Sequence, residues 1–422
     1  IDVSKAELDF DYPETVNLPG YKPTYRGHSK QIKQAVSLMN RARKPLLYVG
    51  GGILSSGAER ELKELAELMQ IPVATTLMGK SCFPEDHHLW IGMPGMHGAK
   101  YTNYTITEAD LLIAVGVRFD DRVTGKLAAF ASKAKIIHVD VDPAEIGKNK
   151  AVDVPIVGDA KNVLAGIVAE LRKTGAEPNT EPWLGVLDEW RQQFPLHYGS
   201  KDPSILHPQY VVQRVSELTK DRETVVCTEV GQNQMWACQF YTLRAPRTWV
   251  SSGGLGTMGF GFPAAIGAQA ARPDALVVDI AGDGSIQMNI QELATAKINN
   301  YPVKIIILNN GFLGMVRQWQ ELFYGRRYSA SVLPQDTPDF VKLAEAYGCF
   351  GIRVTKPEEV DAALKAAFDF DGPAIVDCRV EGEEMVYPMV APGGSIDEML
   401  GGVPGAPVSE MLDDEQLEEV WE

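Results

Sequence analysis

The segment Ala281-Gly282-Asp283-Gly284-Ser285 follows the mainly apolar run Leu276–Ile280, and Asn309-Asn310-Gly311 follows a second such run, Val303–Leu308. Short apolar runs bounded by turn residues predict buried strands. Helix Gln287–Ile298 is expected to join the two strands. Because open α/β sheets bind ligands beyond the carboxyl ends of their strands, both polar segments are candidates for one binding site.

Strand and helix patterns alternate on both sides of this region. They predict the α/β class, with two doubly wound parallel-sheet domains at residues 28–173 and 207–382. We expect linkers at 1–27 and 174–206, with a short helix near Trp183–Phe194 in the second linker, and a mobile tail at 383–422. Further strands are predicted at Pro45–Val49, Val73–Thr76, Leu111–Val117, Ile136–Val141, Val154–Val157, Thr224–Thr228, Thr248–Ser251, Gly351–Val354 and Ala374–Val380; further helices are predicted at Ser29–Ala42, Ala58–Met69, Asn162–Arg172, Pro338–Tyr347 and Pro357–Ala367.

Composition excludes several classes of protein. A net charge of -16 argues against non-specific nucleic-acid binding. No apolar run approaches the ~20 residues that span a bilayer, so we expect no membrane segment. The five cysteines are scattered without metal spacing, which predicts buried free thiols in a reducing, cytoplasmic compartment. Ile1-Asp2-Val3 resembles the end of a strand, so we expect the chain to begin inside a longer polypeptide.

The chemistry of the paired segments suits a metal diphosphate. Asp283 offers a carboxylate oxygen, Asn310 a side-chain carbonyl and Phe312 a backbone carbonyl. Mg²⁺ prefers such oxygen ligands. The amides of Gly284 and Ser285 would open a helix whose N-terminus suits a phosphate. Either segment alone would be an ordinary Asp-Gly or Asn-Gly turn; the two together, on neighbouring strands, favour the site.

This pairing resembles the GDG…NN motif of thiamine-diphosphate enzymes. Gly254–Phe260 resembles the family segment that places an apolar side chain, here Met258, beneath the cofactor. Glu229–Gln234 resembles the segment that lines the diphosphate, although the family usually has His where this chain has Asn233. A glycine-rich turn with a core methionine is the alternative for the first segment. The resemblance implies that thiamine diphosphate is bound by Gly231, Gln232, Asn233, Gly256, Met258, Gly284, Ser285 and Met315.

Two further segments resemble acetohydroxyacid synthases. Gly314–Gln320 is similar to the segment whose tryptophan, here Trp319, shapes the pocket for the second substrate. Gly116–Gly125 and Gly95–Gly98 are similar to the FAD-binding domain of the same enzymes. The resemblance runs from about residue 20 to residue 394. For Trp319 the alternative is an ordinary aromatic on an amphipathic helix.

Features of the first domain also agree with a flavin. Gly50-Gly51-Gly52 closes a strand and would leave room for a ligand. Arg118 and Arg122 could neutralise a diphosphate or stack on a ring, or could be a solvated charge run. His97 could contact flavin or cap a turn. The resemblance implies an FAD site made by Gly50, Gly51, Gly52, Met96, His97, Arg118, Asp120, Arg122, Asp140, Val141, Asp159 and Ala160.

The resemblance implies decarboxylation of pyruvate and its joining to a second 2-oxo acid, pyruvate or 2-oxobutyrate, at the start of branched-chain amino-acid biosynthesis. FAD would be structural, and a small regulatory subunit is a possible partner. The active site would lie between subunits of a homodimer or tetramer, with a catalytic glutamate on an N-terminal domain that we expect to be missing, so the chain alone is expected to be inactive. A glyoxylate carboligase, a pyruvate oxidase and a non-catalytic cofactor-binding fragment are the alternatives. The implied catalytic residues here are Met258, Met315, Trp319 and Arg122.

Overall fold

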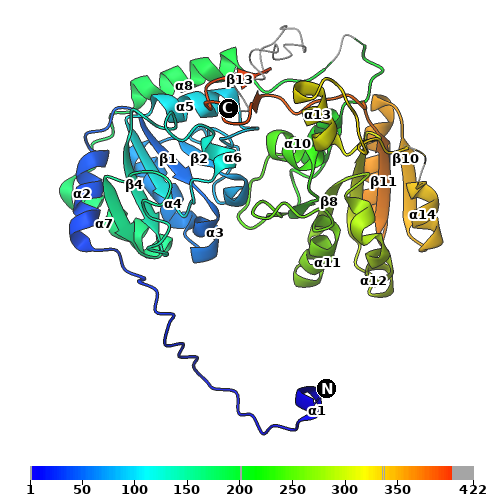
Figure 1. Cartoon of the computed structure of the whole chain (residues 1–422), viewed down its shortest axis with the longest axis horizontal. Helices are drawn as coiled ribbons and strands as arrows, with labels where there is room; N and C mark the ends of the chain where they lie inside the picture. Colours follow the sequence, from blue (N-terminus) through cyan, green and yellow to red (C-terminus); the bar gives the residue numbers. More distant parts are fainter. Residues whose placement is uncertain (1, 200–201, 335, 337, 402–422) are drawn as a thin grey trace.

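The computed structural model describes residues 2–199, 202–334, 336 and 338–401. Two α/β domains lie side by side (Figure 1), and each is built on a sheet whose strands are all parallel. The predicted fold class is therefore confirmed. The amino-terminal segment up to residue 25 extends away from both domains and is largely exposed.

The first domain has a five-stranded sheet in the order β2-β1-β3-β4-β5. Every residue of the interior strand β1 is buried, because helices cover both faces of the sheet. Leu47 and Val49 pack toward α2, α4 and α7, whereas Leu46 and Tyr48 pack toward α5 and α8. Its elements are α2 Ser29–Met39, β1 Pro45–Val49, α3 Gly51–Ser56, α4 Glu59–Met69, β2 Val73–Thr75, η1 Leu77–Gly79, α5 Lys100–Glu108, β3 Leu111–Val115, α6 Asp121–Thr124, β4 Lys135–Asp140, β5 Val154–Val157, α7 Ala160–Thr174 and α8 Glu181–Gln193.

The second domain has a six-stranded sheet in the order β10-β11-β9-β8-β6-β7. Its strands are again covered on both faces, by α9, α10 and α15 on one side and by α11, α12 and α14 on the other. Its elements are α9 Pro208–Leu218, β6 Thr224–Thr228, α10 Gln232–Phe240, β7 Trp249–Ser251, α11 Gly261–Ala271, β8 Leu276–Gly282, η2 Ile286–Glu292, α12 Leu293–Ile298, β9 Lys304–Asn309, α13 Gly314–Phe323, α14 Phe340–Ala346, β10 Phe350–Val354, η3 Pro357–Glu359, α15 Val360–Asp369 and β11 Ala374–Arg379.

Three local predictions differ from the structure. The helix predicted over Gln287–Ile298 is a 3₁₀ segment, η2, followed by the short α12, with a kink at Asn289. Residues Asp2–Lys5 form a four-residue helix, α1, rather than the end of a strand. The helix expected in the second linker is α8, and its Trp183 and Leu187 are buried in the core of the first domain.

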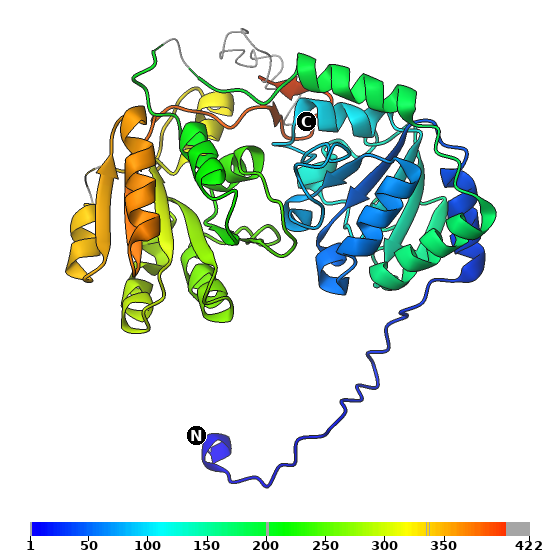
Figure 2. The ribbon, with the colours of Figure 1, turned by 180° about the vertical axis from the view of Figure 1, so that it is seen from behind.

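Residues 383–401, called the strap below, cross from the second domain back to the first (Figure 2). The amide of Val390 donates to the carbonyl of Met96 at 2.8 Å, and the amide of Lys126 donates to the carbonyl of Gly394 at 2.8 Å. Ile396 is buried in the first domain's core. This part of the predicted mobile tail is therefore ordered, and residues 402–422 lie outside the described part of the chain.

A buried ion pair also joins the two domains. The Nζ atom of Lys80 lies 2.6 Å from Glu85, and both side chains are fully buried. Lys80 donates to the carbonyl of Cys238 at 3.0 Å, and Glu85 accepts from the amide of Leu243 at 2.9 Å. Because a buried charge is costly unless it is paired, these contacts favour one arrangement of the domains.

Two expectations from composition can be compared with the structure. All five cysteines are buried and none forms a disulfide, as predicted. Within the described ranges, no helix combines the length and the apolar character that a membrane span requires.

Candidate active site

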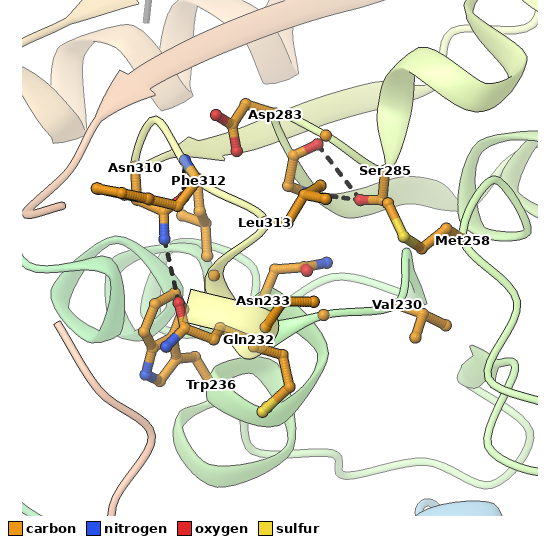
Figure 3. Close-up of a pocket in the computed structure, with 17 residues that line it drawn as sticks. Val230, Gln232, Asn233, Trp236, Met258, Asp283, Ser285, Asn310, Phe312 and Leu313 are labelled. Carbon is orange, nitrogen blue, oxygen red and sulfur yellow. Dashed lines mark hydrogen bonds between the residues drawn. The ribbon is translucent and has the colours of Figure 1, made fainter. Parts of the chain in front are cut away.

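The two motif segments of the second domain meet at one edge of its sheet. Strands β8 and β9 are neighbours, with Gly282 paired with Leu308, so Asp283 and Asn310 leave the sheet side by side (Figure 3). Both face one pocket, as the order of the strands predicted. The pocket is lined by Val230, Gly231, Gln232, Asn233, Trp236, Met258, Gly282, Asp283, Gly284, Ser285, Leu308, Asn310, Phe312, Leu313, Gly314, Met315 and Val316.

Asp283 is a buried carboxylate that lacks a basic partner among the residues of the described ranges. Its Oδ2 atom accepts a hydrogen bond from the amide of Gly311 at 3.0 Å. Burial raises the pKa of Asp283 to about 7, and the hydrogen bond from the Gly311 amide offsets only part of this rise. A divalent cation in the pocket would supply the missing positive charge, so this carboxyl group fits a metal site.

Asn310 presents its two amide atoms to different partners. Its Nδ2 donates to Oε1 of Gln232 at 3.1 Å, and its Oδ1 accepts from the amide of Phe312 at 3.2 Å. Phe312 itself is held by a bridge to Val332. The side-chain oxygen of Asn310 thus remains next to the pocket, where a cation could use its second lone pair.

Ser285 and Gly284 form the turn after Asp283. The hydroxyl of Ser285 accepts from the amide of Gly282 at 3.1 Å and lies 3.3 Å from its carbonyl, so the hydroxyl closes the turn. A Cβ on Gly284 would lie 2.6 Å from Leu313, which explains the glycine. The α-helix expected to start here is the 3₁₀ segment η2, so a phosphate would meet individual amides rather than the dipole of a long helix.

The segment 229–234 contributes Asn233 to the pocket lining, and hydrogen bonds fix the orientation of this side chain. Nδ2 of Asn233 donates to the carbonyls of Glu229 and Ile280, at 3.2 and 2.9 Å, so both N–H groups of this amide face the protein interior. A cofactor would meet only the oxygen of this amide. Its backbone is set by Gly231, whose φ of 153° favours glycine.

Sequence reasoning missed the role of Glu229. This buried carboxylate accepts from the amides of Gly259, at 2.6 Å, and Phe262, at 3.0 Å, and so holds the loop that carries Met258. Burial raises the pKa of Glu229, and backbone donors offset part of the rise. The available signal was an acidic residue directly after a buried strand, beside a glycine-rich loop.

The remaining candidates of this domain divide into two groups. Met258 and Met315 line the pocket. Gly256 is exposed and lies outside its lining. Trp319 packs in a separate apolar cluster with Phe323 of its own helix and Met96 of the first domain. Trp236, Leu313 and Gln318 contact the pocket or its lining residues without having been singled out.

In the first domain, the glycines after β1 serve packing. A Cβ on Gly50 would lie 2.4 Å from the carbonyl oxygen of Gly116, and one on Gly52 would lie 2.5 Å from its Cα. Gly51 starts α3 and faces Met78. On the side where a Cβ would stand, Gly50 and Gly52 therefore face Gly116.

The polar candidates of the first domain follow β3, β4 and β5, at one edge of the sheet. Asp159 caps α7 by accepting from the amide of Asn162 at 3.1 Å, and Ala160 begins that helix. Asp140 accepts from the amide of Asp142 at 2.9 Å, and burial raises its pKa. The others are the half-buried Asp120 and the exposed Arg118, Arg122 and Val141.

Met96 and His97 lie where the first domain meets the strap and α10. Met96 donates to the carbonyl of Arg122 at 2.8 Å, and the carbonyl of His97 accepts from Gln239 at 3.0 Å. Burial lowers the pKa of His97 to about 4, so the imidazole is neutral at pH 7. Its Nδ1 atom is buried and has no hydrogen-bond partner in the described structure.

Comparison with known proteins identifies both domains. The family model described as the thiamine pyrophosphate enzyme C-terminal TPP binding domain matches residues 229–378, and the central-domain model matches residues 32–167. An acetolactate synthase of Mycobacterium leprae is 50% identical over 404 residues, covering 94% of this chain and 64% of that protein. The acetolactate synthase large subunit of Corynebacterium glutamicum is 49% identical, with 93% and 64% covered. A probable acetolactate synthase large subunit of Methanocaldococcus jannaschii is 48% identical, with 94% and 68% covered.

The chain spans about 65% of the length of the first two of these relatives. The matched domains coincide with the two parallel sheets, and identity close to one half extends over nearly the whole chain. The chain belongs to the family of acetolactate synthase large subunits, within the thiamine pyrophosphate enzymes.

Proposed function

We propose that this protein is the catalytic subunit of an acetohydroxyacid synthase. It would decarboxylate pyruvate and join the remaining two-carbon unit to a second 2-oxo acid, pyruvate or 2-oxobutyrate. The observation that carries the proposal is the pocket of the TPP binding domain, where the buried carboxylate of Asp283 and the amide oxygen of Asn310 adjoin. The names of the relatives support the choice of reaction.

The donor atoms at this pocket fit Mg²⁺ and a diphosphate together. The protein offers one carboxylate, one amide oxygen and, at Phe312, one backbone carbonyl. The described residues contain no group of three His, Cys, Asp or Glu side chains that could hold a metal alone. An octahedral ion would therefore need diphosphate oxygens and water as well. Thiamine diphosphate, when bound, supplies the electron sink for decarboxylation.

The apolar residues of the pocket would order and shield the reacting groups. Met258 and Met315 line the pocket together with Leu313, so the cofactor would lie against side chains that exclude water. Glu229 would act on Met258 indirectly, by holding the amides of its loop. Trp319, in the adjoining cluster with Met96, would contact the second substrate.

We further propose an FAD site at the carboxyl edge of the first sheet. Gly51 starts α3 there, and Arg118 and Arg122 are exposed at the same edge, where they would pair with a diphosphate; Arg122 now lies 3.8 Å from the carboxylate of its neighbour Asp121. Asp140 ends β4 nearby. Since the proposed reaction has no net redox step, the flavin would have a structural role.

The proposed assembly contains more than one chain. The relatives are named large subunits, which supports a smaller regulatory partner. The partner subunit of the whole enzyme would complete the active site from outside the pocket, where Leu255 and Met288 are exposed. We propose that the assembly works in the cytoplasm.

The test is a carboligation assay on the native protein with Mg²⁺ and thiamine diphosphate. Acetolactate from pyruvate, and acetohydroxybutyrate when 2-oxobutyrate is added, would support the proposal. Bleaching of a flavin during turnover would instead indicate a pyruvate oxidase, and product from glyoxylate a glyoxylate carboligase. Cofactor binding without any product would indicate a binding protein.

Replacement of Trp319 by Leu should shift the ratio of the two products by roughly tenfold, because one methylene in an apolar pocket is worth ~1–3 kcal/mol.

A further inference from the structure

A chain of buried amides runs from the proposed metal site to the strap. Nδ2 of Asn310 donates to Oε1 of Gln232 at 3.1 Å, and Nε2 of Gln232 donates to Oε1 of Gln318 at 2.9 Å. Nε2 of Gln318 then donates to the carbonyl of Val386 at 3.2 Å. All three side chains are at least 96% buried, so water does not compete for these bonds. Figure 3 shows the first of them.

Backbone groups of the strap determine the direction of every hydrogen bond in this chain of side-chain amides. The amide of Val386 donates to Oε1 of Gln318 at 2.8 Å, while its carbonyl accepts from Nε2 of the same side chain. Nε2 of Gln232 also donates to the carbonyl of Glu384 at 3.0 Å. Because a backbone N–H only donates and a C=O only accepts, neither glutamine can rotate its amide by 180° without losing bonds.

The fixed glutamines, together with the amide of Phe312 that donates to Oδ1 at 3.2 Å, leave Asn310 one orientation. If its amide turned over, Oδ1 would face Oε1 of Gln232, and two acceptors would meet in a buried position. Gly314 allows this close contact, since a Cβ there would lie 2.0 Å from Oε1 of Gln232. The polarity that starts at the strap thus keeps the oxygen of Asn310 beside the pocket and its nitrogen away from it.

We propose that Gln232 and Gln318 are positioning residues that select the oxygen of Asn310 as the atom presented to Mg²⁺. Mg²⁺ binds oxygen and does not bind the nitrogen of a primary amide, so an unconstrained asparagine would offer the wrong atom part of the time. Gln232 would therefore act on the metal through Asn310. This inference rests on the proposed metal site.

The test measures the affinity of the native protein for Mn²⁺, a spectroscopically visible substitute for Mg²⁺, with thiamine diphosphate present. Replacement of Gln232 by Met should weaken Mn²⁺ binding about tenfold, and replacement of Gln318 by Met should weaken it less, because the bond to Glu384 remains. The matched control is Gln209→Met. Gln209 is equally buried and bonds the Glu384 side chain at 3.1 Å, but the bonds described for it include none to Asn310, Gln232 or Gln318, so affinity should not change.

A second variant, Asn310→Asp, distinguishes selection of the Asn310 oxygen from simple support of the loop that carries residue 310. Asn310→Asp offers an oxygen in either orientation, so adding Gln232→Met to it should cost nothing further in Mn²⁺ affinity. A loss that persists in this background, or an unchanged affinity in Gln232→Met alone, would overturn the inference. If Gln232→Met does not fold, as judged by thermal unfolding, Gln318→Met gives the same comparison. If Asp283→Ala also leaves Mn²⁺ binding intact, the proposed site itself is wrong.

Discussion

The two domains place polar candidates at the same edge of the same kind of sheet, but they use them differently. In the second domain, oxygens of Asp283 and Asn310 adjoin a pocket. In the first domain, Asp159 caps its own helix, and Gly50 and Gly52 pack against Gly116. A polar residue at the carboxyl edge of the sheet is therefore a candidate for ligand binding. Whether it can bind a ligand depends on the contacts that it already makes within the protein. The following predictions test this contrast.

The largest effect is expected from Asp283→Ala. Asp283 is the acidic side chain of the pocket lining, so its loss should weaken Mg²⁺-dependent binding of thiamine diphosphate on the order of 100-fold or more. Quenching of tryptophan fluorescence, with Trp236 in the pocket, can measure the affinity. Asp159→Ala in the first domain is the control and should have no effect. Equal affinities in all three proteins would place the metal elsewhere.

Acid should act on the first domain through His97. Burial lowers its folded-state pKa from 6.5 to about 4, so between these values the unfolded chain binds the proton that the folded chain refuses. Stability from this group is complete above pH 6.5 and falls by about 3 kcal/mol as the pH drops to 4. His97→Gln should remove that part of the acid sensitivity. Urea unfolding at pH 7.5 and pH 4.5 tests it; an unchanged difference would assign the acid sensitivity to other groups.

Gly52→Ala separates packing from ligand binding in the first domain. The new Cβ would lie 2.5 Å from Cα of Gly116, and we expect destabilisation of about 2 kcal/mol in thermal or urea unfolding. Gly185→Ala in α8 meets nothing within 4 Å and should be neutral or stabilising. If Gly52→Ala kept full stability and lost only flavin binding, this edge would resemble the second domain after all.

The smallest effect is expected at Asp159. Removal of its cap on α7 by Asp159→Ala should cost about 1 kcal/mol in unfolding free energy. Asp159→Asn keeps an oxygen for the cap and should keep both stability and flavin affinity. A fall in flavin affinity in the Asn variant, measured by flavin fluorescence, would restore a ligand role for this carboxylate.

The strands and the meeting of the two motifs could be predicted from sequence, because both depend on local patterns. Runs such as Ile305–Leu308 are apolar throughout, which marks a strand covered on both faces. The glycines and asparagines that follow then mark its end. Adjacent strands must bring such ends together, so Asp283 and Asn310 were found without knowledge of any distant contact.

The packing and hydrogen-bond partners of individual atoms could not be predicted, because these partners lie far away in the sequence. Gly52 packs on Gly116, and Asn233 bonds the carbonyl of Ile280. Gln318 lies within a segment quoted for its tryptophan, yet its role depends on Val386, 68 residues later. The strap was assigned to a mobile tail on composition alone, although its apolar residues, such as Ile396, are buried against the other domain.

The returning strap also determines how the molecule would respond to a protease. Cleavage between α8 and α9 would break the covalent link between the first domain and the second. The strap, bonded to Met96 and Lys126, and the Lys80–Glu85 pair would still hold the pieces together. A nicked sample should therefore elute as a single particle in gel filtration and separate into two bands only in denaturant.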